Sequence, residues 1–467
     1  MRFLSDSEEA TWNRMRWIIT SNHRRNTERD RYAEGEELLR WSGYKLPNGW
    51  EAEQTPLHWP AKAIEVFASR AKPKGYSIEG HDDVVRELEL AWTDSTGEFA
   101  EHLAIEAALR HGCSFVFVSA GNTAAGEPRV VVSPRSALGA TCLMDPRTRR
   151  VTAALELVDG GREVLYLPDV ALTLERTSAG RVVVVEESPT FGVPCAPYVH
   201  GATLSRPFGS SRITHSVMGF TRAGMRTFVR QEVSADWYMH PRERLLGVDA
   251  DTFEDGAWTQ SPGDIQALPD VHPDDDPNVP DSLRRAEWHA MPQMTMQPFS
   301  DQFRLIAAQF SGASSIPLQY LGIVSDSNPT SASAIEAQDI DLVRAIRNQH
   351  ESLNLGRRML ALHVLNVSRG ERVDPAEVAS LRPHWEDPRV RSAVEQSQFV
   401  AQQIGSGNFR AGTRETLNLL PITDDEARIH AWRNRQAGNA DLLERIAAMA
   451  NPSASAEPAE PAGPGVK

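Results

Sequence analysis

The amino-acid sequence predicts an α+β fold, with helical layers before and after an antiparallel sheet in chain order. Three observations support this class. Apolar residues recur at helical spacing through the first 110 residues, short valine-rich runs separated by Gly, Asp or Pro begin after Gly112, and long stretches without proline return from residue 212. Helices and strands that are segregated along the chain in this way are typical of α+β proteins.

The first helical layer is expected over three segments: residues 5–42, 61–72 and 81–110. Ser5 or Ser7 can cap the first helix, and Trp12, Met15 and Ile19 recur along one side of it. Residues 24–31 are highly charged and predict a surface that faces solvent or another subunit. Residues 43–60, with two glycines and several prolines, predict a loop.

Strands are expected over six short segments: residues 113–118, 129–133, 151–157, 163–167, 170–176 and 181–186. Asp159-Gly160 lies between two alternating runs, and Ala179-Gly180 lies between the last two segments. Such dipeptides favour tight hairpins, so we expect one mostly antiparallel sheet. Residues 192–210 hold Pro194, Pro197 and Pro207 and predict a linker.

The second half of the chain predicts five further helices: residues 212–238, 299–311, 332–368, 388–405 and 423–450. Between the first two, residues 248–297 are rich in proline and carry 11 acidic residues against two arginines, a local charge of −9. Residues 312–331 predict a loop of small residues. Residues 451–467 hold too few apolar residues to form a core and are expected to be disordered.

Composition excludes several classes of protein. The 467 residues include 49 Lys and Arg against 63 Asp and Glu, which leaves a formal net charge of −14. This argues against a protein that coats nucleic acid, because such binding needs clustered basic residues facing the phosphates. No apolar run approaches the roughly 18 residues of a membrane span, and no signal peptide is evident, so we expect synthesis in the cytoplasm and no membrane contact.

No motif of enzyme chemistry is present. The sequence lacks a phosphate-binding GxxxxGK[ST] loop, HExxH, paired CxxC and GxSxG, so we predict no catalytic residue, no metal and no cofactor. The three cysteines, Cys113, Cys142 and Cys195, form no disulfide pattern. One alternative stays open: acids within residues 270–281 could hold a divalent cation in a nuclease, although consecutive aspartates in a proline-rich loop splay apart.

Arg222, Arg226 and Arg230 lie four residues apart in the predicted 212–238 helix and therefore share one face. Two readings remain open for this face. It is either a solvated stripe with Glu232 and Asp236 as partners, or a surface that contacts a neighbouring subunit or a polyanion.

Four phrases of the sequence occur in a characteristic order: residues 207–247, which include PFGSSRI and PRERLLG; residues 263–269, GDIQALP; residues 310–322, FSGASSIPLQYLG; and residues 328–337, NPTSASAIEA. In this order they resemble the portal (head–tail connector) proteins of long-tailed bacteriophages, over roughly residues 30–440. Residues 113–190 resemble that family in their order of predicted elements and not in their amino-acid sequence. A third hypothesis is a non-viral scaffold or adaptor protein. The two can be distinguished by whether the gene lies beside a gene for a large terminase, as expected for a portal protein.

The resemblance implies a portal-type subunit that assembles into a dodecameric ring at one vertex of the virion. Its parts would be as follows: wing, 1–205; first stem helix, 206–247; clip, 248–297; second stem helix, 298–312; tunnel loop, 313–331; long helix and crown, 332–450; and disordered tail, 451–467. Double-stranded DNA would pass through the axial channel. Further implied partners are the large terminase subunit, the head–tail adaptor, and the major capsid and scaffolding proteins.

The resemblance also implies two sets of functional residues, in addition to the arginine face. Those of the tunnel loop would meet DNA, with Gly312 and Gly322 as hinges: Ser314, Ser315, Gln319, Ser325, Asp326, Ser327 and Asn328. Those of the clip would dock the motor and the adaptor: Asp264, Asp270, Asp274, Asp275, Asp276, Arg284 and Arg285. A neutral or acidic channel wall suits a sliding polyanion, because a basic wall would hold its phosphates.

Overall fold

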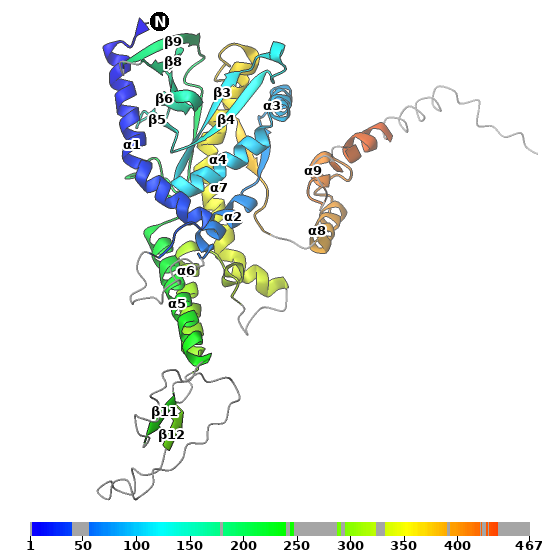
Figure 1. Cartoon of the computed structure of the whole chain (residues 1–467). Coiled ribbons are helices and arrows are strands. Elements are labelled where there is room, and N and C mark those ends of the chain that lie inside the picture. The colour runs from blue at the N-terminus through cyan, green and yellow to red at the C-terminus, as the bar shows by residue number, and fades with distance from the viewer. Residues whose placement is uncertain are drawn as a thin grey trace, which may run out of the picture. The chain divides into compact units, whose positions relative to one another are not determined.

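The computed structural model describes residues 2–39, 56–177, 181–239, 243–246, 287–290, 295–323, 332–389, 393–420, 422, 426–427 and 429–437. By internal contacts the chain divides into two units, residues 1–388 and 389–467. Figure 1 shows their elements. The first unit combines helices with antiparallel sheets, which confirms the predicted α+β class.

The chain begins with β1 (Arg2–Phe3) and the long helix α1 (Asp6–Glu34). At its start the Ser5 backbone N–H donates to the Glu8 carboxylate across 2.7 Å, which satisfies an otherwise unpaired donor. The helix ends at Glu34 and not at residue 42 as predicted, because Gly35 adopts a left-handed conformation with φ 71°. Its side with Trp12, Met15 and Ile19 is buried, as the spacing predicts.

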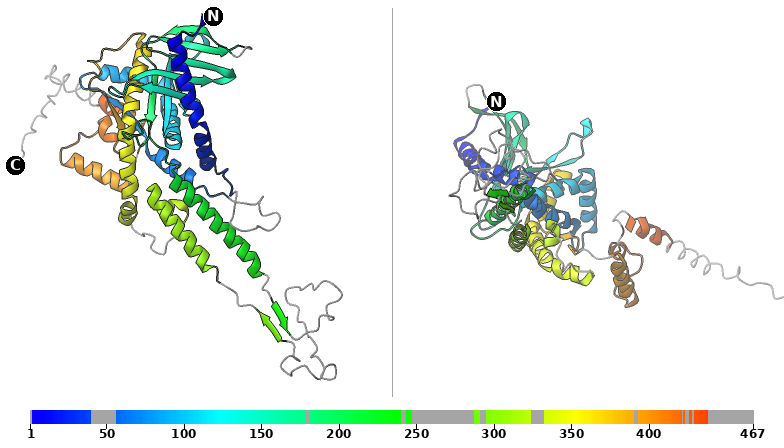
Figure 2. Two further views of the ribbon diagram at one scale, coloured as in Figure 1. Left: turned by 90° about the vertical axis from the view of Figure 1, so that its left-hand side faces the viewer. Right: turned by 60° about the horizontal axis from the view of Figure 1, so that its bottom comes forward.

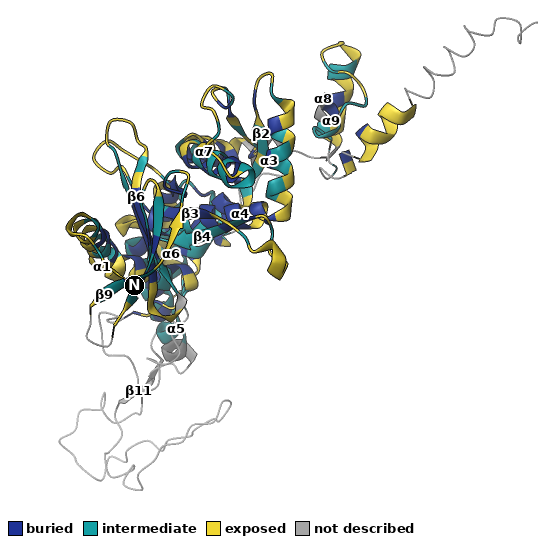
Figure 3. Cartoon of the chain, turned by 90° about the horizontal axis from the view of Figure 1, so that it is seen from above, coloured by how far each residue is buried: buried dark blue, intermediate teal, exposed yellow. Residues whose placement is uncertain are grey.

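Six strands form the larger sheet, in the order β1-β9-β8-β7-β6-β5, and all pairs are antiparallel. The strands after β1 are β5 (Ala140–Met144), β6 (Val151–Val158), β7 (Arg162–Tyr166), β8 (Val170–Arg176) and β9 (Val182–Pro189). Helix α1 packs on one face of this sheet, as Figure 3 shows from above. Gly160, with φ 81°, turns the chain between β6 and β7, so the hairpin predicted at Asp159-Gly160 is confirmed.

A second sheet of three strands, in the order β10-β3-β4, lies beside the first. Its strands are β3 (Cys113–Ala120), β4 (Val130–Ser136) and β10 (Cys195–Val199). The prediction of one sheet and of a linker over 192–210 was therefore wrong. All five residues of β10 are buried, and Pro197 is tolerated because β10 is an edge strand. A separate apolar cluster that includes Phe115, Cys142 and Ala154 joins the two sheets.

The helix predicted over 81–110 is two helices, α3 (Asp82–Asp94) and α4 (Gly97–His111). Thr96 between them adopts a left-handed conformation with φ 51°, which ends the helical path. Gly97 is required there because a Cβ atom would lie 2.6 Å from the Trp92 ring. The preceding helix, α2 (Trp59–Arg70), was predicted to within two residues at each end.

Helix α7 (Ala332–Arg369) runs through the main core and packs along β10. Gly356 permits the close approach, since a Cβ atom there would lie 2.4 Å from the Pro197 carbonyl oxygen. A short sheet joins β2 (Pro73–Ser77) to β13 (Arg382–Trp385), a pairing between distant segments that was not predicted. The predicted helix over 332–368 is confirmed.

An ion pair inside the main core links α4 to α7. The Arg357 Nε donates to the Glu101 carboxylate, and both side chains are at most 1% exposed. The Tyr198 hydroxyl donates to the same carboxylate across 2.8 Å. The Arg357 guanidinium also lies 4.5 Å from the centre of the Trp385 ring, so its charge is compensated on two sides.

The second unit holds α8 (Ala393–Gly405) and α9 (Arg414–Leu417), and residues 429–437 are also helical. Helix α8 confirms the helix predicted over 388–405, although it begins five residues later. The described residues of the predicted 423–450 helix are helical. The predicted tail at 451–467 lies outside the described residues.

Candidate functional site

Two antiparallel helices extend from the main core, α5 (His215–Met239) and α6 (Gln297–Ser314). Both were predicted, and their long mutual contact is visible in Figure 2. The start of α5 and the end of α6 lie in the core, where Val217, Ala307 and Phe310 are buried. Their other ends therefore point away from the core, toward the segment between them.

Arg212 anchors this helix pair. Its Nε donates to the Ala63 carbonyl oxygen of α2 across 3.1 Å, and its Nη2 donates to the Ser314 carbonyl oxygen at the end of α6. The guanidinium carbon lies 3.2 Å from the centre of the Phe67 ring. Burial lowers the pKa of Arg212 to about 9, so the side chain remains charged at neutral pH and holds three elements together.

Trp59 at the start of α2 fills the space between the two helices and the core. Its ring centre lies 5.3 Å from that of Phe303 and 5.2 Å from that of Phe310, both on α6. On α5, Gly224 allows Trp59 to approach, since a Cβ atom would lie 3.1 Å from its ring. Aromatic contacts of this kind stabilise the packing of the helix pair against the core.

Two short strands lie between these helices in the chain: β11 (Glu243–Leu246) follows α5, and β12 (Glu287–Ala290) precedes α6. They pair antiparallel, with Glu243 opposite Ala290. This pairing brings together the two ends of the acidic insertion. The seven residues expected to dock partners lie outside the described residues: Asp264, Asp270, Asp274, Asp275, Asp276, Arg284 and Arg285.

The arginine face of α5 borders a cleft of about 640 Å³ between α5 and α1. Arg222, which is exposed, and Arg226, which is half-buried, line it, together with Arg24, Arg31 and Glu28 of α1. Arg31 is paired with Glu37 at 2.9 Å. Arg230, also half-buried, is not among the residues that line this cleft. Two of the three arginines thus meet α1 of their own chain, and neither predicted reading included that contact.

Part of the segment predicted as a tunnel loop is helical or buried. Ser314 is the last residue of α6, is 3% exposed, and donates from its hydroxyl to the Phe310 carbonyl oxygen across 2.8 Å. Its place in a DNA-facing loop is therefore wrong for the single chain, and Gly312 lies inside α6 and not at a hinge. Ser315 ends the helix with a left-handed conformation at φ 56°.

The next residues are also held by the core. Gln319 lies half-buried in a 3-10 turn, Leu318–Leu321, and both Ile316 and Leu321 are buried. The Tyr320 hydroxyl contacts Arg70 of α2 and Asp339 of α7, and these two residues form an ion pair at 2.8 Å. The other four residues expected to meet DNA lie outside the described residues: Ser325, Asp326, Ser327 and Asn328.

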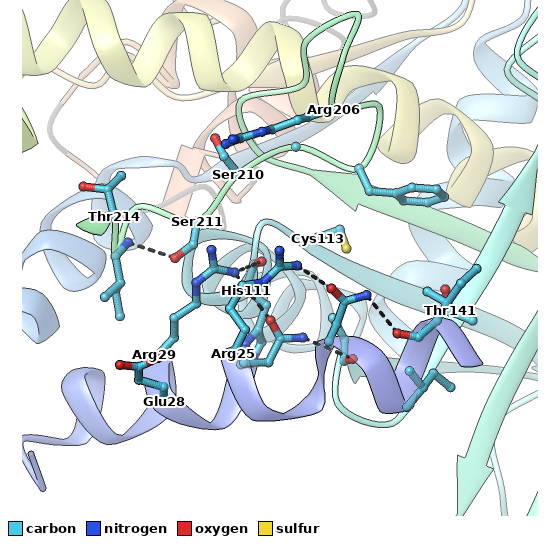
Figure 4. A pocket seen from close by; sticks show the side chains of 18 of the residues that line it. Arg25, Glu28, Arg29, His111, Cys113, Thr141, Arg206, Ser210, Ser211 and Thr214 are labelled. Atoms are coloured by element: carbon cyan, nitrogen blue, oxygen red, sulfur yellow. Dashed lines mark hydrogen bonds between the residues drawn. The ribbon is translucent and has the colours of Figure 1, made fainter. Parts of the chain in front are cut away.

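A second cavity, of about 370 Å³, lies where α1 meets the two sheets and the turn that leads into α5. Figure 4 shows Arg25 and Arg29 of α1 and Arg206 of the turn in its lining, beside Ser210 and Ser211. The lining includes one acidic residue, Glu28. Predicted only as a charged surface, this part of α1 instead borders a cavity because residues 206–215 pack back against it.

Charges in this cavity repel one another. The pKa of Arg29 is lowered to about 10, mainly by burial and in smaller part by the positive charges of Arg25 and Arg206. Its Nη1 donates to the His111 carbonyl oxygen across 2.8 Å, while its buried Nε has no partner among the described residues. Burial, Arg110 and Arg29 lower the pKa of His111 to about 3, so this imidazole is neutral at physiological pH. An anionic group is the ligand class that such a cavity suits.

The described residues contain no group of three or more histidines, cysteines or acids that could hold a metal ion. Among them, no helix combines the length and the apolar character needed to span a membrane.

No family model matches the sequence, and no curated protein matches it. Solved structures do match. Chains from the "Virion of native gene transfer agent (GTA) particle" and the "Neck of native GTA particle computed with C12 symmetry" each share 12% identity and cover 78% of this chain and 90% of their own, with TM-scores of 0.43 and 0.44. A chain from the "Neck of empty GTA particle computed with C6 symmetry" has the same identity and coverage and a TM-score of 0.39. At these values the matches assign this chain neither a family nor a function.

Proposed function

We propose that this chain is a structural component of the neck of a phage-like particle, and more narrowly a portal subunit. Twelve copies would form a ring at one capsid vertex, and double-stranded DNA would pass through its channel during packaging and ejection. The observation that carries the proposal is the α5–α6 helix pair, which is anchored in the core and encloses a long acidic insertion between β11 and β12.

The order of the elements supports the same role. A wing of helices and sheets precedes the helix pair, and the long helix α7 follows it, which agrees with the order of the portal-like sequence phrases. In this role α5 and α6 form the stem and the insertion forms the clip. The large terminase subunit and then the head–tail adaptor would dock there, with capsid and scaffolding proteins around the wing.

Electron microscopy of the purified full-length protein tests the proposal. We expect ring-shaped particles with a central opening, in solution or in procapsids assembled with the matching capsid and scaffolding proteins. A chain that stays monomeric at all concentrations and is absent from procapsids would contradict it.

The placement of the tunnel loop sharpens a second experiment. Because residues 314–321 are buried or half-buried, we narrow the proposed DNA-contacting segment to residues 324–331, which lie outside the described residues. Deleting those eight residues and bridging the gap with a short glycine linker should leave ring assembly intact and reduce DNA packaging or retention. Unchanged packaging would remove the loop from the mechanism.

The acidic insertion supplies a third experiment. Changing Asp270, Asp274, Asp275 and Asp276 to lysine should weaken binding of the motor or adaptor while the wing unfolds at the same temperature. Binding that is unchanged at low salt would contradict a docking role for these acids, since exposed charges act most strongly there.

A further inference from the structure

Two exposed faces of the first unit lie on different sides of it. Helix α1 forms one of them, and helix α3 with the start of α4 forms the other, as Figures 1 and 3 show from two directions. The far end of α4 packs against α1, where Arg110 pairs with Asp30. The α1 face carries one large exposed apolar side chain, Trp17, and the α3–α4 face carries three: Leu90, Phe99 and Leu103. Exposed apolar residues that cluster among charged ones mark surfaces of association.

The α1 face is basic and aromatic. Arg14, Trp17, Ser21 and Arg24 follow one another at spacings of three, four and three residues, so they share one side of the helix. Trp17 is 69% exposed. Both arginines are exposed, and neither pairs with a carboxylate among the described residues. Residues 10–27 of this helix contain four arginines and no acidic residue.

The α3–α4 face is acidic and apolar. Leu90 is 68% exposed and Phe99 is 65% exposed, and Leu103 follows one turn after Phe99. Exposed acids flank these side chains: Asp82, Asp83, Asp94 and Glu98. Arg86 is also exposed on this helix, three residues after Asp83 and four before Leu90, so it shares their side of the helix. The backbone N–H of Arg129 donates to Asp94. The exposed acids of the face still outnumber its exposed arginine.

The two faces match in pattern and in length. On α1 an aromatic residue lies between arginines ten residues apart, a span of about 15 Å at 1.5 Å per residue. On α3 an apolar residue lies between acids eleven residues apart, Asp83 and Asp94, a span of about 17 Å. A second helix laid along either face would therefore meet charges of one sign at both ends and an apolar side chain between them, Trp17 on α1 and Leu90 on α3; on α3 it would also meet Arg86.

We propose that the α1 face of one copy of this chain binds the α3–α4 face of the next copy. Such a contact joins different surfaces of the two partners, so the copy at each end of an assembly keeps one unoccupied face and can bind a further copy. A ring forms when the rotation between neighbouring copies brings the last copy back to the first. Trp17 would be its central anchor, because buried tryptophans dominate the binding energy of many interfaces. Only the number of copies in that ring rests on the proposed function; the pairing of the two faces does not.

Charge reversal on each face gives a test that does not depend on loss of folding. In one variant Arg14 and Arg24 become glutamate (Arg14→Glu, Arg24→Glu), and in the other Asp94 and Glu98 become lysine (Asp94→Lys, Glu98→Lys). All four side chains are exposed, so circular dichroism and the unfolding temperature should stay near those of the wild type. Each variant alone places like charges against each other, and we expect its assembly midpoint to rise at least tenfold in concentration.

Mixing the two variants in equal amounts should restore assembly. The glutamates on α1 of one variant then meet the lysines of the other, and the two unchanged faces meet as in the wild type, so rings of alternating copies form. A single chain with all four substitutions should assemble as well. Mass photometry and negative-stain imaging measure both results. The matched control, Arg147→Glu with Arg150→Glu on the exposed β5–β6 turn, changes the charge equally and should leave assembly unchanged.

The outcomes separate this inference from the proposed function. Rings from the wild type and from each single-face variant alike would overturn the paired faces and leave the portal role intact. Failure of the mixture and of the four-fold variant to assemble, with both variants folded, would also overturn it. A wild type that never forms rings contradicts the portal role; in that case loss and restoration of smaller oligomers by the same variants still supports the paired faces.

Discussion

Replacing Arg357 by methionine should destabilise the first unit strongly, because it leaves the Glu101 carboxylate in the core without its cation. Both side chains are at most 1% exposed. Removing one partner of a buried ion pair costs about 3–5 kcal/mol. Methionine fills much of the space of the arginine stem, so this loss reflects the unpaired charge more than a cavity.

Urea unfolding of the full-length protein at low concentration, followed by tryptophan fluorescence, measures this effect. The matched control is Arg369→Met on the same helix, because Arg369 also contacts two carboxylates, Glu87 and Glu377, but is partly exposed. The control should cost about 1 kcal/mol, as exposed pairs do. In the double variant Glu101→Leu with Arg357→Met, most of the lost stability should return.

Two results would refute the reasoning. One is a loss in Arg357→Met no larger than that in Arg369→Met. The other is a double variant less stable than Arg357→Met alone, which would show that the ion pair adds stability beyond compensation of its own buried charges.

Three further predictions concern other parts of the core. Burial lowers the pKa of four histidines to about 3 or 4: His111, His200, His350 and His363. As pH falls, the unfolded chain binds protons at these histidines before the folded chain does. The unfolding free energy should therefore fall below pH 6.5, by up to about 1.4 kcal/mol per pH unit for each histidine. Urea titrations at pH 5 and 7 check this, and equal midpoints would contradict it. Gly356→Ala should lower stability by about 1–3 kcal/mol, because the new methyl group clashes with Pro197. Gly312→Ala in α6, where a Cβ atom would meet no neighbour, should raise stability by at most about 1 kcal/mol. Thermal unfolding of the two variants measures this difference. Cys142 is fully buried and its thiol pKa is raised by that burial, so mass spectrometry should find iodoacetamide on it only after unfolding, and rapid labelling of the native chain would contradict this.

Elements with strong local signals were predicted well. Helices α5, α6 and α7 and the hairpin at Gly160 follow from spacing and turn residues that lie within one short stretch of chain. The break at Thr96 was missed although Asp94-Ser95-Thr96-Gly97 is a run of capping and turn-forming residues that indicates a helix boundary. The fit of Gly97 against Trp92 is a packing contact that only the structure shows. Strand β10 was missed because Pro194 and Pro197 are typical of a linker, while the edge position that permits them exists only in the folded sheet.

The candidate surfaces divide in the same way. The acidic insertion, the shared face of Arg222, Arg226 and Arg230, and the charged stretch of α1 are visible in the sequence, because charge and helical spacing are local properties. The structure decided what these residues meet. It buried Ser314, placed Arg222 and Arg226 against α1, and brought Arg206 to Arg25 and Arg29.

The sequence by itself therefore determined the α+β class, the helix pair around an acidic insertion, and the overall negative charge. Only the tertiary structure decided that Glu101 pairs with Arg357, that Arg212 joins three elements, and that helices α1 and α3 lie on different sides of one unit. The physical reason is the distance along the chain: Glu101 and Arg357, which are 256 positions apart, meet through packing, and no local pattern encodes such a contact.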